Sequence, residues 1–219
     1  MELFINYLRL ISVLKRGDDL EQMEIKMIKK IQKGDIRAFE EMVKKYELIV
    51  YKIAFKSVGN EEDAKDVTQE AFLKIHKNIS KFNFQSKFST WLYRIVANTA
   101  IDFLRKKKTV YSIDQNIEGE EGEFKREIAD ENEMNQPEKN LEKNEIKLEV
   151  QSAILGLSIE HRTVLILREY QNLSYDEISN ILGIKVGTVK SRIKRARENL
   201  KDKLLETSYL NNKKYEGRE

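Results

Sequence analysis

The side chains best placed for hydrogen bonding to a polyanion lie near the C-terminal end of the chain. Between Lys185 and Lys203 there are eight basic residues and two acidic ones. Four polar residues there recur at i, i+3, i+4 and i+7 and would share one face of a helix: Thr188, Ser191, Arg192 and Arg195. Five cations flank that face: Lys185, Lys190, Lys194, Arg197 and Lys201. Such side chains can bind base edges and phosphates, so the pattern indicates nucleic-acid binding.

Two features indicate how this basic segment is positioned. Apolar residues at helical spacing, from Val186 to Leu200, form a stripe that would hold the helix onto a domain. Upstream, Ser174 and Glu177 form a capping box that begins a shorter helix, which ends at Gly183. A capped helix, a tight turn and a basic helix predict a helix-turn-helix whose second helix enters the DNA major groove. The competing interpretation is a solvated basic surface helix.

A second cluster of functional side chains is acidic. The stretch DAKDVTQEAF, residues 63–72, places Asp63, Asp66 and Glu70 on one helical face at i, i+3 and i+7, with Gln69 beside them. We predict that this face is exposed. Taken alone, such a face is usually only solvated. Acid–base catalysis would require a pocket and orienting partners, which no neighbouring motif provides.

A third cluster is aromatic. The loop KFNFQSKFS, residues 81–89, is followed by the only tryptophan, and it alternates rings with amide, hydroxyl and cationic groups. Such a loop can stack on and hydrogen bond to unpaired bases. Alternatively, the rings anchor the loop to the core, and spacing alone does not separate these two interpretations. The following helix presents a polar side suited to a nucleic-acid backbone: Arg94, Asn98, Asp102 and Arg105.

The elements that carry these clusters are predicted to be helical. The chain has 219 residues, one Pro and nine Gly, with 35% charged residues, which is typical of an all-α protein. Helices are expected over 23–32, from Asp35 to near Gly59, from Asn60 to the Phe-rich loop, over 90–107, and from 144 onward, with Asp35, Asn60 and Ser158 at helix starts. The predicted divisions are an N-terminal extension 1–22, a first domain 23–107, a flexible acidic linker 108–143, a second domain 144–208 and a tail 209–219. Between Asp114 and Glu145, twelve acidic and four basic residues account for the linker prediction.

Several protein classes lack their usual residues here. The chain has no cysteine, so we expect the cytoplasm, and its two histidines, His76 and His161, are isolated. Glycine-rich phosphate loops and G-x-S-x-G turns do not occur in the sequence. We therefore predict no enzyme activity, no metal and no cofactor. Residues 2–14 are too short and too interrupted to cross a bilayer, so no membrane insertion is expected, and Met23 competes with Met1 as the native start.

Three motifs together resemble one family. DAKDVTQEAFLKIHKNISKF and FSTWLYRIVANTAIDFLRKK are similar to the promoter-melting domain, region 2, of bacterial sigma factors. LSYDEISNILGIKVGTVKSRIKRARENLK is similar to their region 4. Their order, with no middle domain, resembles the extracytoplasmic-function (ECF) group of the sigma-70 family.

The resemblance implies partners and site residues. The partners are bacterial RNA polymerase core, promoter DNA and an anti-sigma factor, and the linker would pass through the polymerase's RNA exit path. The polymerase-binding residues would be Asp63, Asp66, Gln69 and Glu70. The minus-ten element would be bound by Phe82, Asn83, Phe84, Gln85, Ser86, Phe88, Trp91, Arg94, Asn98 and Arg105. The minus-thirty-five element would be bound by Lys185, Thr188, Lys190, Ser191, Arg192, Lys194 and Arg195.

Two other functions compete with this one. The first is a helix-turn-helix transcription regulator of the response-regulator type, which acts without being a polymerase subunit. That class usually carries a receiver domain with strands, which the helical first domain argues against. The second is a metal-dependent nucleic-acid hydrolase that uses the clustered acids, and it lacks convergent partners.

Overall fold

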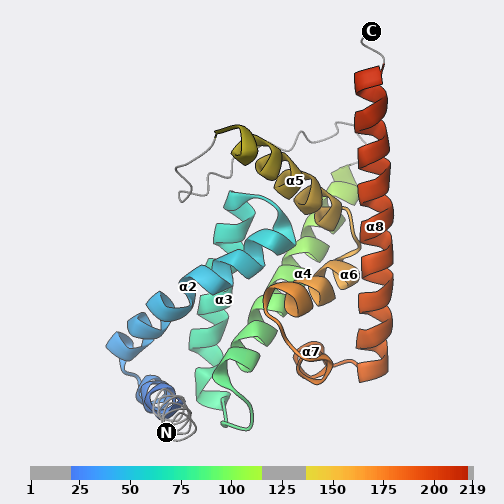
Figure 1. Ribbon diagram of the computed structural model, residues 1–219. Helices are drawn as coiled ribbons and strands as arrows, with labels where there is room; N and C mark the ends of the chain where they lie inside the picture. Colours follow the sequence, from blue (N-terminus) through green and yellow to red (C-terminus); the bar gives the residue numbers. More distant parts are fainter. Residues whose placement is uncertain (1–20, 115–136, 217–219) are drawn as a thin grey trace, which may run out of the picture.

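The computed structural model describes residues 21–114 and 137–216, and every element in these two stretches is helical (Figure 1). Residues 21–32 form the first helix. The other elements of the first half are α2 (Ile36–Val58), α3 (Glu61–Asn78), a 3-10 turn η1 (Ile79–Lys81) and α4 (Phe88–Asp114). Those of the second half are α5 (Pro137–Leu155), α6 (Ile159–Leu165), a π-helical turn η2 (Ile166–Tyr170), α7 (Tyr175–Leu182) and α8 (Val186–Glu216).

The predicted helix starts of the first half are confirmed. Asp35 accepts a hydrogen bond from the backbone N–H of Ala38 at 3.1 Å, and Asn60 accepts one from the backbone N–H of Asp63 at 2.9 Å. Between them, α2 ends at Gly59, whose φ of 90° is the left-handed conformation that glycine adopts without a steric penalty. These local signals fix where α2 stops and α3 begins.

The helices α2, α3 and α4 pack against one another around an apolar core. On α3 the buried residues are the five that the helical period predicts: Ala64, Val67, Ala71, Phe72 and Ile75. The helix of residues 21–32 joins this core through Ile28 and Ile31. Its Gln32 side chain donates to the backbone oxygens of Ile79 (2.9 Å) and Phe82 (2.8 Å), which ties the helix to the aromatic loop.

The helices that flank the predicted linker are longer than the sequence pattern indicated. Helix α4 continues to Asp114 and α5 begins at Pro137, so helix extends into both ends of the 108–143 segment. Proline is favoured at the first helical position, and the Glu- and Lys-rich residues that follow it are good helix formers. The remainder of the predicted linker, most of the N-terminal extension and the end of the tail lie outside the described residues.

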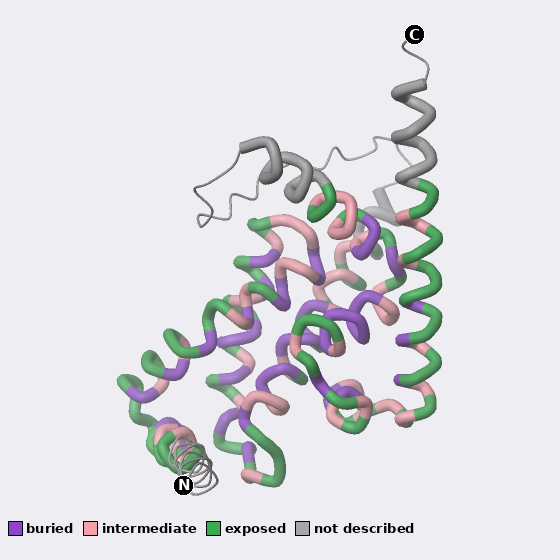
Figure 2. The backbone as a smooth tube through the Cα atoms, viewed as in Figure 1, coloured by how far each residue is buried: buried purple, intermediate pink, exposed green. Residues whose placement is uncertain are grey.

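The two halves share one hydrophobic core. A single cluster of buried apolar residues includes Leu92 and Val96 of α4 together with Leu167, Ile178 and Ile193 of the second half. Helix α4 contacts α6 and α7, and α2 contacts α5 and α6. In Figure 2 the buried positions gather in the middle of the molecule, while the outer side of α8 is exposed.

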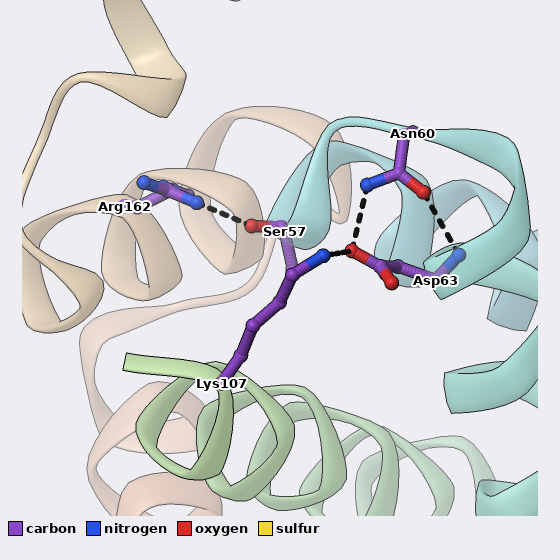
Figure 3. A network of polar contacts seen from close by, with 5 residues as sticks. All are labelled: Ser57, Asn60, Asp63, Lys107 and Arg162. Carbon is purple, nitrogen blue, oxygen red and sulfur yellow. Dashed lines mark hydrogen bonds and ion pairs between the residues drawn. The ribbon is translucent and has the colours of Figure 1, made fainter. Parts of the chain in front are cut away.

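A buried arginine connects the two halves (Figure 3). Arg162 of α6 is 9% exposed and donates from Nη1 to the backbone oxygen of Ser57, near the end of α2. Its Nη2 donates to the backbone oxygens of Leu155 and, at 3.2 Å, Leu157, at the end of α5. Carbonyls at helix ends lack partners within the helix and carry the negative end of the dipole, so one guanidinium serves two helix ends. Burial lowers the pKa of Arg162.

Side-chain packing also holds together the junction between the two halves, where the ends of α2 and α5 meet α6. A Cβ built on Gly59 would lie 2.5 Å from Leu155 Cδ1, so a larger residue at this position would displace the Leu155 side chain. Nearby, the Lys56 ammonium lies 3.8 Å from the centroid of the Tyr170 ring, and burial lowers the pKa of this lysine. The junction therefore combines apolar packing, a cation–π contact and a shared guanidinium.

Candidate nucleic-acid interface

The helix-turn-helix forms as predicted. The Ser174 hydroxyl accepts from the backbone N–H of Glu177 at 3.2 Å, and the Glu177 carboxylate accepts from the backbone N–H of Ser174 at 2.8 Å. These bonds lower the pKa of Glu177. Gly183 ends α7 with a φ of 66°, and the Ser179 hydroxyl donates to the backbone oxygen of Ile184 at 2.6 Å. These hydrogen bonds fix the start of α7 and the turn that leads into α8.

Helix α8 separates a buried face from a polar face. Val189, Ile193 and Ala196 are fully buried, and Val186 and Leu200 at the ends of the stripe are half-buried. The four residues predicted to meet bases are together on the other side. Ser191 and Arg195 are exposed, and Thr188 and Arg192 are half-exposed.

The flanking cations differ in exposure and in whether an acidic side chain lies beside them. Lys185 and Lys190 are exposed, and Lys194 lies 3.9 Å from Glu198 at the helix surface. Arg197 pairs with Glu169 at 2.6 Å, and this hydrogen bond raises the pKa of Arg197. Exposed pairs of this kind stabilise little, so a phosphate could replace Glu169 at small cost.

On α3 the structure separates Asp63 from the other predicted acids. Asp66, Gln69 and Glu70 are exposed. The Asp63 side chain is only 15% exposed, and its Oδ2 lies 2.5 Å from Lys107 Nζ on α4 (Figure 3). The prediction that all three carboxylates are exposed is therefore wrong for Asp63. Because Asn60 caps α3, Asp63 falls in the first turn and turns back toward the cap and α4.

One apolar residue on this acidic face was missed from the sequence. Leu73 follows Asp66 and Glu70 at i+7 and i+3, and it is 60% exposed. Its position is out of phase with the buried stripe of α3, which is the signal that could have found it. A single exposed leucine is common on protein surfaces, and here it adds apolar area to the acidic face.

The rings of the aromatic loop differ in burial. Phe82 and Phe88 are buried, at 5% and 2% exposed, and their ring centroids lie 5.6 Å apart. These two rings anchor the loop to the core. Phe84 is partly exposed, its φ is 61°, and Lys29 lies 5.7 Å from its ring centroid. A positive φ is uncommon for a bulky residue and clusters at functional sites.

The polar residues around that loop lie in solvent. Asn83, Gln85 and Ser86 are exposed, and Trp91 is half-buried. Further along α4, Arg94, Asn98 and Arg105 are exposed along one side, as the helical period predicts. Arg105 also lies 3.6 Å from Glu160 of α6. The polar side of α4 therefore borders the second half of the molecule.

A cavity of about 310 Å³ lies between the aromatic loop and the helix of residues 21–32. Its lining includes Glu24, whose role the sequence patterns did not indicate. The Glu24 carboxylate accepts hydrogen bonds from the Tyr46 hydroxyl and, at 2.6 Å, from Lys45 Nζ. A lone acid on a short helix carries no pattern that marks it as a cavity residue, so only the tertiary structure identifies it.

Within the described residues, no cluster of three or more His, Cys, Asp or Glu side chains could hold a metal ion. No helix in the described parts is both long and apolar enough to span a bilayer. His76 packs edge-on against Phe39, and His161 Nδ1 lies 3.4 Å from Asn199.

A helical domain with an aromatic loop, packed on a helix-turn-helix domain with a basic second helix, defines a DNA-binding protein of the helix-turn-helix class. The sigma-70 region 2 profile matches residues 42–110, and the sigma-70 region 4 profile matches residues 147–200. The chain is 41% identical over 187 residues to the ECF RNA polymerase sigma factor SigW of Bacillus subtilis, covering 84% of this chain and 98% of that protein. The chain therefore belongs to the ECF sigma factors of the sigma-70 family.

Other relatives agree with this assignment. The ECF RNA polymerase sigma-E factor of Escherichia coli K12 is 36% identical over 180 residues, covering 81% of this chain and 92% of that protein. Among solved structures, the sigma factor RpoE in complex with the anti-sigma factor NepR from Bartonella quintana superposes with a TM-score of 0.59 at 22% identity, covering 76% of this chain and 96% of that one. CnrH in complex with the cytosolic domain of CnrY superposes with a TM-score of 0.57 at 24% identity, covering 83% of this chain and 96% of that one. These structures share the fold.

Proposed function

We propose that this chain binds the core RNA polymerase of a bacterium and directs it to promoters that carry minus-ten and minus-thirty-five elements. The observation that carries the proposal is the presence of both sigma-70 regions in order, each with its polar face exposed. Its work would be binding and positioning in the cytoplasm, with the chemistry supplied by the polymerase.

The minus-thirty-five element is assigned to α8. Thr188, Ser191, Arg192 and Arg195 form the face that meets base edges, because the buried stripe fixes the opposite side against the domain. Lys185, Lys190 and Lys194 flank that face and contact phosphates, which positions the helix without reading sequence. Binding through these cations releases counterions and weakens as salt rises.

The minus-ten element is assigned to the aromatic loop and the polar side of α4. Phe84 is the ring available for stacking, with Asn83, Gln85 and Ser86 exposed around it. Phe82, Phe88 and Trp91 support that loop from below, through ring contacts of 5.4–5.7 Å. Arg94, Asn98 and Arg105 follow the strand along α4. Capturing one or two bases contributes roughly 1–3 kcal/mol each, whereas opening a promoter unstacks many steps at roughly 1.4 kcal/mol per step. The chain alone therefore does not open a promoter.

The polymerase-binding surface is assigned to the exposed face of α3. Asp66, Gln69 and Glu70 supply polar contacts, and Leu73 supplies apolar area within the same face. Asp63 was predicted as a fourth contact, and its bond to Lys107 makes it a positioning residue for this face. An anti-sigma factor is proposed as a further partner, because the structural neighbours RpoE and CnrH were solved with NepR and with the cytosolic domain of CnrY.

In-vitro transcription with bacterial core polymerase and a randomised promoter library tests the proposal. The chain plus core should start RNA synthesis at defined sites, and permanganate should detect unpaired thymines only when both are present. Arg94→Ala should weaken the open complex, whereas Arg37→Ala, an exposed arginine of α2, should not. A chain that binds DNA tightly and never co-purifies with core would instead be a regulator that acts outside the polymerase.

A further inference from the structure

The cavity beside the aromatic loop has the composition of a nucleobase site. Its volume of about 310 Å³ lies at the lower end of the range for small-molecule sites. Ile25 and Ile28 of the first helix and the Phe82 and Phe88 rings give it apolar walls. Hydroxyl groups of Ser86 and Ser89, and the Lys87 ammonium, lie at the same cavity and provide polar contacts for a sugar and its phosphate.

Glu24 places a fixed hydrogen-bond acceptor in this cavity. Its side chain is 20% exposed, and Tyr46 and Lys45 both contact the same carboxylate oxygen, Oε1. Burial and the bond to Glu24 raise the pKa of Tyr46, so this hydroxyl remains a donor at all working pH values. Both contacts are to Oε1, and Oε2 is the second acceptor of the same carboxylate.

The charge around Glu24 permits a polyanion to approach. Lys45 lies 2.6 Å from the carboxylate, Lys87 lines the cavity, and Lys29 lies over the Phe84 ring. These three cations offset the repulsion between Glu24 and DNA phosphates. The carboxylate therefore selects a base by its edge without excluding the strand.

We propose that Glu24 reads the Watson–Crick edge of the base held in this cavity and favours a base that carries an exocyclic amino group over thymine. This inference rests on the proposed function, because it takes the ligand to be a base unpaired from promoter DNA. Adenine, cytosine and guanine each present an amino donor to Oε2. Thymine presents one N–H between two carbonyl oxygens, and these oxygens would face the carboxylate. Carboxylates are used in this way to accept from the cytosine amino group.

The test uses the reconstituted holoenzyme and the promoter selected with the randomised library. Each minus-ten position is changed to all four bases, and open-complex formation is measured for wild type and for Glu24→Gln. At one position the wild type should disfavour thymine by about tenfold, the effect expected of one hydrogen bond to a charged group. Glu24→Gln should reduce that discrimination to about twofold, because an amide both donates and accepts, and it keeps the bond from Tyr46.

Two further variants separate base reading from a structural role. Tyr46→Phe removes one of the two bonds that hold Glu24 and keeps the carboxylate and its contact with Lys45, so the thymine discrimination should persist even if the protein is less stable. Glu41→Gln makes the same chemical change at an exposed site outside the cavity and should leave the base profile unchanged.

The outcomes distinguish this inference from the proposed function. If wild type and Glu24→Gln both support transcription with the same base profile at every position, the inference is overturned and the proposed function stands. A loss of discrimination in Tyr46→Phe equal to that in Glu24→Gln would also overturn it. No transcription by the wild type with any promoter would refute both.

Discussion

Replacing Arg162 by alanine removes a guanidinium that connects α2, α5 and α6. Three backbone oxygens lose their donor, those of Ser57, Leu155 and Leu157. Hydrogen bonds to a charged group contribute roughly 1.5–3 kcal/mol each, and part of this is offset because the buried cation no longer has to be desolvated. The net loss in the free energy of unfolding should be about 3–5 kcal/mol. For a chain of this length that corresponds to a fall in melting temperature of roughly 10 °C.

Urea unfolding followed by circular dichroism and by the fluorescence of Trp91 checks this prediction. Circular dichroism reports on all helices, and Trp91 reports on the first half, so loss of the connection should make the two transitions diverge. Arg37→Ala, an exposed arginine on α2, is the matched control and should change stability by less than about 0.5 kcal/mol. If Arg162→Ala unfolds within about 1 kcal/mol of wild type and both probes coincide, the guanidinium does not hold the junction.

Four further perturbations test other parts of the structure. Gly59→Ala should cost at least about 1–2 kcal/mol in thermal unfolding, since its φ of 90° is left-handed and the new Cβ would overlap a leucine of α5; an unchanged melting curve would contradict this packing. Asp66→Lys should weaken core polymerase binding by about tenfold or more in a pull-down titration, whereas Glu41→Lys, at an exposed position of α2, serves as the charge-matched control and should bind normally. Arg192→Ala should cost about 1–3 kcal/mol at one base pair of the minus-thirty-five element; a uniform loss across sequences would make Arg192 a phosphate contact. Because hydrogen bonds lower the pKa of Glu177 in the folded state, its stabilisation is complete above the ordinary glutamate pKa and is lost as pH falls through the lowered value. The difference in the free energy of unfolding between wild type and Glu177→Gln should therefore shrink on acidification. A difference that does not change with pH would contradict the lowered pKa of Glu177.

Local signals in the sequence predicted most of the fold. The caps at Asp35, Asn60 and Ser174 form as expected, because capping depends only on residues within one helical turn. The buried faces of α3 and α8 were also predicted, since helical period alone decides which side of an amphipathic helix meets a core. The polar face of α8 follows from the same period.

Features that depend on contacts between distant segments could not be predicted. Arginine is rarely buried, and Arg162 is buried only because the ends of α2 and α5 meet beside it. The π-helical turn η2 holds one extra residue per turn, and Arg168 stabilises the segment after it through a 2.7 Å bond to the backbone oxygen of Leu173. Asp63 and Glu24 were misjudged or missed for the same reason: their partners, Lys107 and Tyr46, are 44 and 22 residues away.

The single core shared by the two halves sets a thermodynamic limit on how this protein engages DNA. Promoter elements centred about 25 base pairs apart are separated by roughly 85 Å of B-form helix, a span that α4 and α7 cannot bridge while they pack against each other. Apparent affinity falls in proportion to the fraction of molecules in the competent, separated form. A substitution that loosens this junction should therefore make the free chain easier to unfold and the holoenzyme quicker to occupy promoters.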